Sequence, residues 1–106
     1  MKIIWASLAM KSLKEIYLYH KIVAGERIAR QIKSGIFAAT KQLSNHPELG
    51  QIEPTLEKLK EGHRYLVQSN YKIIYKLVRE GVLITDLFDT RQDPVKINDP
   101  ERIVNP

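Results

Sequence analysis

The residues best suited to chemistry in this sequence are cations that lie among strand-like segments. Arg64 and Lys72 fall in two neighbouring runs rich in β-branched and aromatic residues, and Arg91 follows a third such run. A strand places alternate side chains on opposite faces, so cations in register can line one face of a sheet. Such an array would bind phosphate and stabilise the charge that develops when a phosphodiester is attacked. The alternative is a solvated strand face whose long side chains only keep their charged ends in water.

The connection between the first two runs decides whether Arg64 and Lys72 share a face. If Ser69 and Asn70 form a two-residue turn, Arg64 pairs with Tyr75 and Lys72 lies on the opposite face. A three-residue loop would unite the two cations on one face instead. The sequence allows both arrangements.

Signatures of other chemistries are absent from the sequence. It contains no Gly-rich phosphate loop, no HExxH motif and no Gly-x-Ser-x-Gly motif. The lack of cysteine excludes disulfides, thiolate nucleophiles and Cys-based metal sites. His20, His46 and His63 are far apart and do not have the spacing of metal ligands. We therefore expect no metal and no cofactor.

The positive charge of the chain is concentrated near its start. The net charge is +5, from 17 Lys and Arg against 12 Asp and Glu in 106 residues. Residues 1–46 carry eight cations and two acids, whereas residues 77–106 carry four cations and six acids. A clustered basic surface attracts acidic partners or phosphate. Because this excess lies outside the strand-like runs, it favours an acidic protein partner, with RNA as the second possibility.

The elements that would position these residues follow from hydrophobic periodicity, which changes from a helical to a strand pattern along the chain. The predicted elements are a strand at 2–5, helices at 7–23 and 26–44, a short helical turn at 55–60, and strands at 65–68, 71–78 and 82–88. The order β-α-α-β-β-β predicts an α+β fold in which a helical hairpin covers one face of a small antiparallel sheet. The other face is then expected to be exposed and to be the place to look for function.

Length and composition indicate a single domain. We expect it to span residues 1–92, followed by a polar tail at 93–106 that lies along the surface. No apolar run approaches the roughly 20 residues of a membrane helix. The first residues also do not resemble a secretory signal. These features predict a cytoplasmic protein that does not enter a membrane.

Several short motifs occur in an order and spacing that extend over almost the whole chain. They are Ile4-Trp5, then Leu13, Ile16 and Tyr19, then Leu43 with His46-Pro47-Glu48-Leu49-Gly50, then 63–67, 70–75 and 88–94. In these motifs the chain resembles the RelE/ParE superfamily of bacterial type II toxins, also called plasmid stabilisation proteins. The resemblance implies a growth-arresting toxin that a cognate antitoxin neutralises in a hetero-oligomer.

The superfamily divides by target, and the resemblance suggests residues for each branch. RelE-like members cut messenger RNA in the ribosome with basic residues on the sheet, whereas ParE-like members poison DNA gyrase. Arg64, Lys72 and Arg91 match the RelE-type basic positions, which would make them catalytic in an RNA-cleaving protein. Glu53 lies near the position where a related branch carries a general-base glutamate.

The sequence departs from the RNA-cleaving pattern at two points. Leu66 stands where a further lysine would be expected, and no tyrosine or histidine follows Tyr75. Both departures weaken proton transfer and charge stabilisation at a scissile phosphate. We therefore predict a ParE-like toxin that binds DNA gyrase. A metal-independent, ribosome-dependent mRNA endoribonuclease and a homologue without activity are the alternatives.

Overall fold

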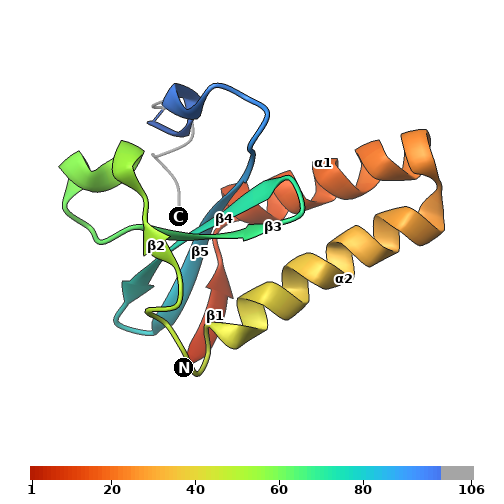
Figure 1. The fold of residues 1–106 in the computed structure, drawn as a ribbon. Coiled ribbons are helices and arrows are strands. Elements are labelled where there is room, and N and C mark those ends of the chain that lie inside the picture. Colours follow the sequence, from red (N-terminus) through yellow and green to blue (C-terminus); the bar gives the residue numbers. More distant parts are fainter. Residues whose placement is uncertain (99–106) are drawn as a thin grey trace.

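Two helices lie against one face of a five-stranded sheet in the computed structural model (Figure 1), which describes residues 1–98. The elements are β1 (Lys2–Trp5), α1 (Ser7–Ala24), α2 (Glu26–Gln42), β2 (Gln51–Ile52), the 3-10 turn η1 (Pro54–Leu59), β3 (Arg64–Gln68), β4 (Tyr71–Val78), β5 (Gly81–Asp89) and the 3-10 turn η2 (Pro94–Asn98). The strand order is β1-β5-β4-β3-β2. This arrangement confirms the predicted α+β class. Because β1 pairs parallel to β5, the sheet is mixed rather than wholly antiparallel.

The helical hairpin formed by α1 and α2 turns on a single residue. Gly25 separates the two helices and has a φ of 93°, a backbone region that glycine enters without steric cost. Small buried residues, Ala9 on α1 and Ala29 and Ala39 on α2, leave room for close approach to the neighbouring elements. Figure 1 shows that the far end of the hairpin projects beyond the edge of the sheet.

The main core lies between the helices and the sheet. Tyr71, Ile73 and Tyr75 alternate along β4 and point into it, as the period of a strand requires. On β5, Ile84 and Leu87 are three residues apart yet both belong to this core. A β-bulge explains this spacing, because the register shifts by one residue on β5 between the partners of Ile74 and Tyr75.

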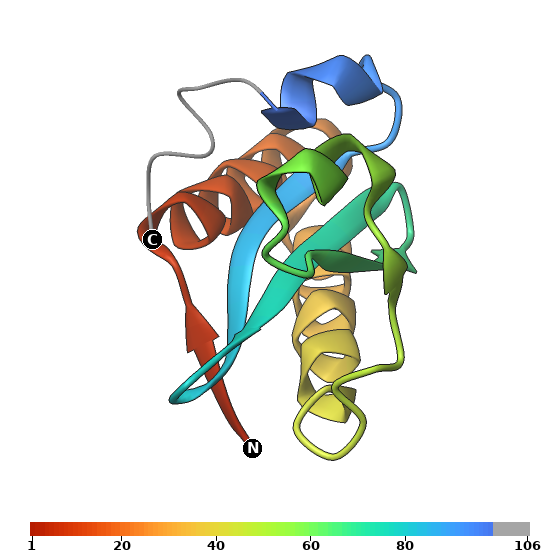
Figure 2. The same cartoon turned by 90° about the vertical axis from the view of Figure 1, so that its left-hand side faces the viewer.

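The opposite face of the sheet is covered in part by η1 and η2, which pack against each other (Figure 2). A smaller apolar cluster of Leu56, Ile74, Phe88 and Ile97 lies beneath them. The expectation that this face is exposed is therefore wrong for this region. Ile97 is buried within the segment expected to lie along the surface, because η2 packs it onto the sheet. The rest of that segment, from residue 99, lies outside the described residues.

The predicted helices and strands agree with the observed elements to within two residues at each end. The short helical turn expected at 55–60 is observed as η1. The elements that the sequence did not indicate are β2 and η2. No helix in residues 1–98 combines the length and the apolar character needed to span a bilayer.

Candidate functional site

The hairpin between β3 and β4 places Arg64 and Lys72 on opposite faces of the sheet. The turn is the two-residue type, and Ser69 in it has a φ of 58°. Arg64 pairs with Tyr75 and Val67 pairs with Lys72. Of the two arrangements that the sequence allows, the structure has the one that separates the cations.

The Arg64 side chain is hydrogen-bonded to the loop that leads from α2 to β2. Its Nη1 donates hydrogen bonds to the carbonyl oxygens of Gly50 (2.7 Å) and Glu48 (3.5 Å). The Tyr75 hydroxyl, on β4, binds the same loop: it donates to the Pro47 carbonyl and accepts from the Gly50 amide, both at 2.8 Å. A Cβ at Gly50 would lie 2.6 Å from the backbone oxygen of residue 65, so only glycine fits. The Arg64 guanidinium is thus directed at the protein's own backbone.

Lys72 forms an ion pair with a buried carboxylate. Its Nζ lies 2.9 Å from Glu53 Oε1, and the Glu53 side chain is fully buried. The other oxygen of Glu53 accepts from the Thr55 amide (3.1 Å) and hydroxyl (2.7 Å). The Lys72 ammonium also lies over the Tyr65 ring, 4.2 Å from its centroid. Lys72 therefore has both a charged and an aromatic partner.

The hydrogen bonds to Glu53 determine its charge. Burial alone would raise the pKa of Glu53, but the hydrogen bonds from Lys72 and Thr55 outweigh it and hold the pKa below its ordinary value. Glu53 is consequently an anion with both oxygens occupied. A general base, in contrast, has an accessible oxygen and a pKa near the working pH.

Arg91 lies at the end of β5 and pairs with Asp89. Its Nε and Nη2 donate to the two carboxylate oxygens of Asp89 at 3.0 and 2.8 Å, and its backbone amide donates to Oδ1 at 2.9 Å. The Arg91 side chain is about half exposed (56%). The hydrogen bonds from Arg91 hold the pKa of Asp89 below its ordinary value. The pair is bidentate, the geometry in which arginine binds carboxylate most specifically.

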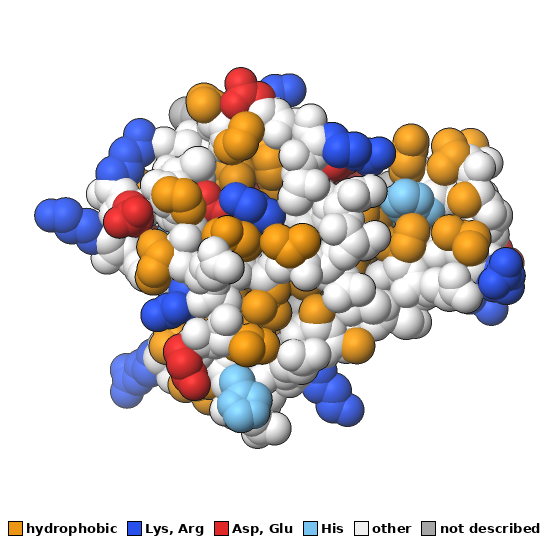
Figure 3. Space-filling model, in the orientation of Figure 1, with side chains coloured by type: hydrophobic (Ala, Val, Ile, Leu, Met, Phe, Trp, Pro, Cys, Tyr) orange, Lys and Arg blue, Asp and Glu red, His pale blue; other side chains and the backbone are white. Residues whose placement is uncertain are grey.

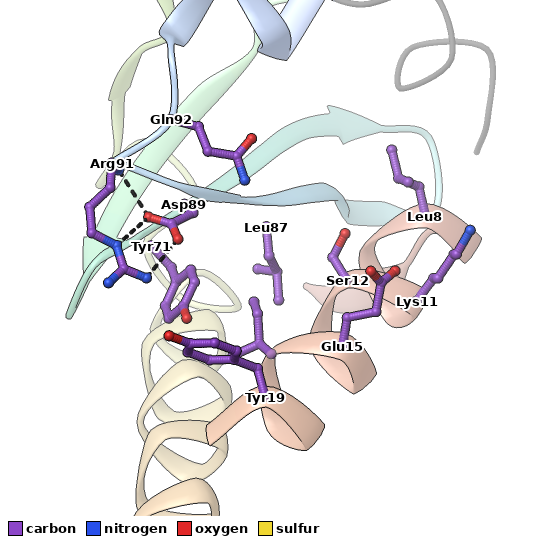
Figure 4. A pocket seen from close by; sticks show the side chains of 11 residues that line it. Leu8, Lys11, Ser12, Glu15, Tyr19, Tyr71, Leu87, Asp89, Arg91 and Gln92 are labelled. Carbon is purple, nitrogen blue, oxygen red and sulfur yellow. Dashed lines mark hydrogen bonds and ion pairs between the residues drawn. The ribbon is translucent and has the colours of Figure 1, made fainter. Parts of the chain in front are cut away.

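The Arg91–Asp89 pair forms one wall of an open cavity of about 620 Å³ between α1 and the end of β5 (Figure 4). The helix contributes residues from three successive turns, and the sheet contributes Tyr71 and Leu87. The lining residues are Leu8, Lys11, Ser12, Glu15, Ile16, Tyr19, Tyr71, Leu87, Asp89, Arg91 and Gln92. Tyrosine rings, an aliphatic floor and charges of both signs make this cavity suited to side chains of a protein partner.

One partly buried contact ties α1 to β4 beside the cavity. His20 Nε2 lies 2.8 Å from the Tyr71 hydroxyl, and the two rings meet edge to face. Tyr19 packs edge to face on His20 from the cavity side. This link joins the far half of α1 to the start of β4.

A second polar cluster joins the segment after η1 to β4. Lys76 Nζ is 2.6 Å from Glu61 Oε1, and His63 Nε2 is 4.0 Å from the same oxygen. His63 is buried, and its Nδ1 has no hydrogen-bond partner among the described residues. Burial, and then the charge of Lys76, lower the pKa of His63, which is therefore neutral near pH 7. No group of three or more His, Asp or Glu side chains within residues 1–98 is arranged to hold a metal ion.

The comparison with protein families determines what kind of chain this is. Residues 3–94 match the family described as the ParE toxin of type II toxin-antitoxin systems, parDE. The chain belongs to the ParE toxin family. This confirms the resemblance to the RelE/ParE superfamily and its ParE-like branch.

A solved structure agrees with this family. The fold is similar to that of a chain in the "Chromosomal ParDE TA system from P. aeruginosa", with a TM-score of 0.70 and 19% identity over 84% of this chain and 95% of that one. At this identity the similarity shows the ParE fold. A search of curated proteins gives no match.

Sequence reasoning about this ParE family chain found the basic residues but not their surroundings. Arg64, Lys72 and Arg91 lie in three separate places, and Glu53 joins only Lys72. The cavity beside α1 was missed, because its two walls come from segments about 70 residues apart. The one signal for it was His20, a polar residue on the apolar face of the first helix.

Proposed function

We propose that this ParE family chain is the toxin of a type II toxin–antitoxin system and arrests growth by binding DNA gyrase. In this proposal a cognate antitoxin neutralises it in a hetero-oligomer, and both proteins act in the cytoplasm. The toxin domain corresponds to residues 1–92, and η2 of the polar C-terminal segment 93–106 packs onto this domain through Ile97. The family match supports the toxin assignment.

The observation that carries a binding mechanism is the pairing of every basic side chain at a RelE-type position. Cleavage by a RelE-type arrangement of basic residues brings several cations to one phosphate. Here Arg64 donates to backbone carbonyls, Lys72 pairs with buried Glu53, and Arg91 pairs with Asp89. Recruiting Lys72 to RNA would leave a buried carboxylate without its cation, which costs several kcal/mol (about 3). These contacts favour a toxin that works by binding another protein.

Two assays on purified components test the target. We expect the chain to inhibit supercoiling by DNA gyrase and to leave mRNA intact on translating ribosomes. Adding the cognate antitoxin before gyrase should restore supercoiling. Cleavage of ribosome-bound mRNA with normal supercoiling would identify the endoribonuclease instead. A chain without either effect that also fails to arrest growth would be an inactive homologue.

Replacing Arg91 separates the two mechanisms. Arg91→Ala removes a half-exposed guanidinium whose partner, Asp89, can turn to water, so the fold should persist. Under the proposal, growth arrest by the variant expressed without antitoxin should match that of the parent chain. An RNA-cleaving toxin would lose its toxicity, because Arg91 would contact the scissile phosphate. Arg79→Ala, at an exposed position of the turn between β4 and β5, is the matched control.

The cavity beside α1 is where we place the antitoxin contact. It is concave, and its tyrosines and charges offer both packing and hydrogen bonds to an inserted segment. Arg91→Ala should therefore weaken antitoxin binding in a titration with the purified antitoxin, while Arg79→Ala should not. Equal affinity for all three chains would place the antitoxin elsewhere.

A further inference from the structure

The far end of α1 exposes apolar side chains that the fold does not use. They are Leu18 (45% exposed), Ile22 (84%) and Val23 (58%). Leu18 and Ile22 are four residues apart and Val23 follows Ile22, so the three lie on one side of the helix. Figure 3 shows hydrophobic side chains gathered at the projecting end of the molecule. We call these three residues the hairpin tip.

The hairpin tip is held on a rigid support. The connection to α2 is the single residue Gly25, and the His20–Tyr71 contact of 2.8 Å anchors the same stretch of α1 to the sheet. On the other side of α1, Lys33 lies over the ring of Tyr17, 5.3 Å from its centroid. The tip therefore presents a preformed apolar surface, which lowers the entropy cost of binding.

The charge around the tip is strongly positive. Residues 7–42 carry seven cations and two acids, so their net charge of +5 equals that of the whole chain. Lys14, Lys21 and Arg27 are exposed and form no ion pair within the described part of the chain. A second copy of this chain would be repelled by this charge, whereas an acidic surface would be attracted.

The shape of the hairpin indicates what it contacts. A projecting apolar element buries most area when it enters a concave surface of a partner. The cavity beside α1 is itself concave and would instead accept a projecting segment. Ile22 and Leu18 would gain nothing from a phosphate backbone, which argues for protein over nucleic acid. The two surfaces thus suit different partners. The hairpin tip would enter a cleft of one partner, whereas the cavity would receive a segment of another.

We propose that the hairpin tip is the surface that docks on the toxin's protein target, in an acidic cleft with an apolar floor, and that the antitoxin binds mainly elsewhere. This inference rests on the proposed function only in requiring that the target is a protein. It adds the residues of contact and the chemistry of the site on the target.

Ile22→Glu tests the inference, because Ile22 is the most exposed residue of the tip and its side chain supports no core. The substitution places a negative charge where the cleft is acidic. Val95→Glu, at a β-branched residue 74% exposed on η2, is the matched control. Each chain is expressed without antitoxin to score growth arrest, and its antitoxin affinity is measured by calorimetry. Circular dichroism confirms that both variants fold.

We expect Ile22→Glu to require at least about tenfold more toxin for the same growth arrest, as for a residue central to an interface, while Val95→Glu behaves as the parent chain. Antitoxin affinity should stay unchanged in both. Growth arrest by Ile22→Glu as strong as that by the parent chain would overturn the inference. So would a loss of antitoxin binding in Ile22→Glu as large as its loss of growth arrest, or a parent chain that does not arrest growth. Direct DNA binding by the parent chain that Lys21→Ala abolishes and Ile22→Glu spares would assign the surface to nucleic acid.

The gyrase assay keeps this result separate from the proposed function. If the parent chain arrests growth without inhibiting supercoiling, gyrase is the wrong target, yet the comparison of Ile22→Glu with Val95→Glu still decides whether the tip is used. If the parent chain and Ile22→Glu inhibit supercoiling equally, gyrase is the target but the hairpin tip is not the surface that contacts it.

Discussion

The two faces of the sheet bury different kinds of side chains. Beneath the helices the core cluster is apolar apart from the hydroxyls of Tyr71 and Tyr75, with Ile36, Ile73 and Ile84 fully buried. Beneath η1 and η2 a small apolar cluster is bordered by the Glu53–Lys72 pair and by His63. Burial of hydrocarbon does not depend on protonation, whereas a buried ion pair does. The apolar cluster beneath the helices should therefore contribute a stability that does not change with pH, whereas the ion pair and histidine beneath η1 and η2 should contribute one that does.

Ile84→Ala should give the largest effect and tests the apolar face. Removing three carbon atoms from a fully buried isoleucine leaves a cavity, and we expect the free energy of unfolding to fall by about 3 kcal/mol. Urea denaturation at about pH 7 and about pH 4 should give the same loss. Ile22→Ala, at an exposed isoleucine, should cost less than about 0.5 kcal/mol. A loss at Ile84 that changes with pH would contradict the distinction between the faces.

Lys72→Met should have the next largest effect and tests the ion pair. At about pH 7 it leaves the buried Glu53 carboxylate without its cation, and we expect a loss of about 2–3 kcal/mol because Lys72 itself is part exposed. The folded-state pKa of Glu53 is lowered, so the stability from the pair is present above the ordinary pKa of 4.5 and is lost as pH falls through the folded value.

The difference between Lys72→Met and the parent chain should consequently shrink in acid, as measured by urea denaturation from about pH 7 down to about pH 3. The double variant Glu53→Leu with Lys72→Met should recover part of the loss, since no buried charge remains. A cost that stays constant with pH would show that Lys72 contributes only packing.

Titration of His63 should give the smallest effect. Its folded pKa lies below the ordinary 6.5, so the unfolded chain binds more protons and stability falls as pH drops below about 6.5. The slope of the free energy of unfolding against pH cannot exceed about 1.4 kcal/mol per pH unit for one titrating group. His63→Leu should flatten the stability curve between about pH 5 and pH 7, while His46→Gln at an exposed loop position should not. An unchanged curve in His63→Leu would mean that other groups set this dependence.

Local patterns were enough to predict the helices and most strands of this fold. A period of three to four residues defined α1 and α2, and β-branched runs separated by two-residue turns defined β3, β4 and β5. The strand β2 was missed because two residues carry no periodicity. The turn η2 was missed because only Val95 and Ile97 are apolar between Pro94 and Pro100, and the burial of Ile97 depends on η1.

The partners of the candidate site residues could not be predicted, because each pairing depends on contacts between residues distant in the sequence. Whether Lys72 and Arg64 share a face depends on one residue of turn length. The pairing of Lys72 with Glu53 joins positions 19 residues apart, and that of His20 with Tyr71 joins positions 51 apart. Residue types identified which side chains carry charge, but the register of the hairpin determined what each charge meets.

The single-residue connection at Gly25 has a consequence for how this family can vary. A hairpin with no loop cannot be lengthened by inserting residues at its turn without breaking one of the helices. Its projection grows only when both helices gain a turn together, about 3.6 residues and 5.4 Å each. Relatives that keep such a glycine should therefore differ in hairpin length by paired insertions of whole turns, so the depth of the complementary cleft would change in discrete steps.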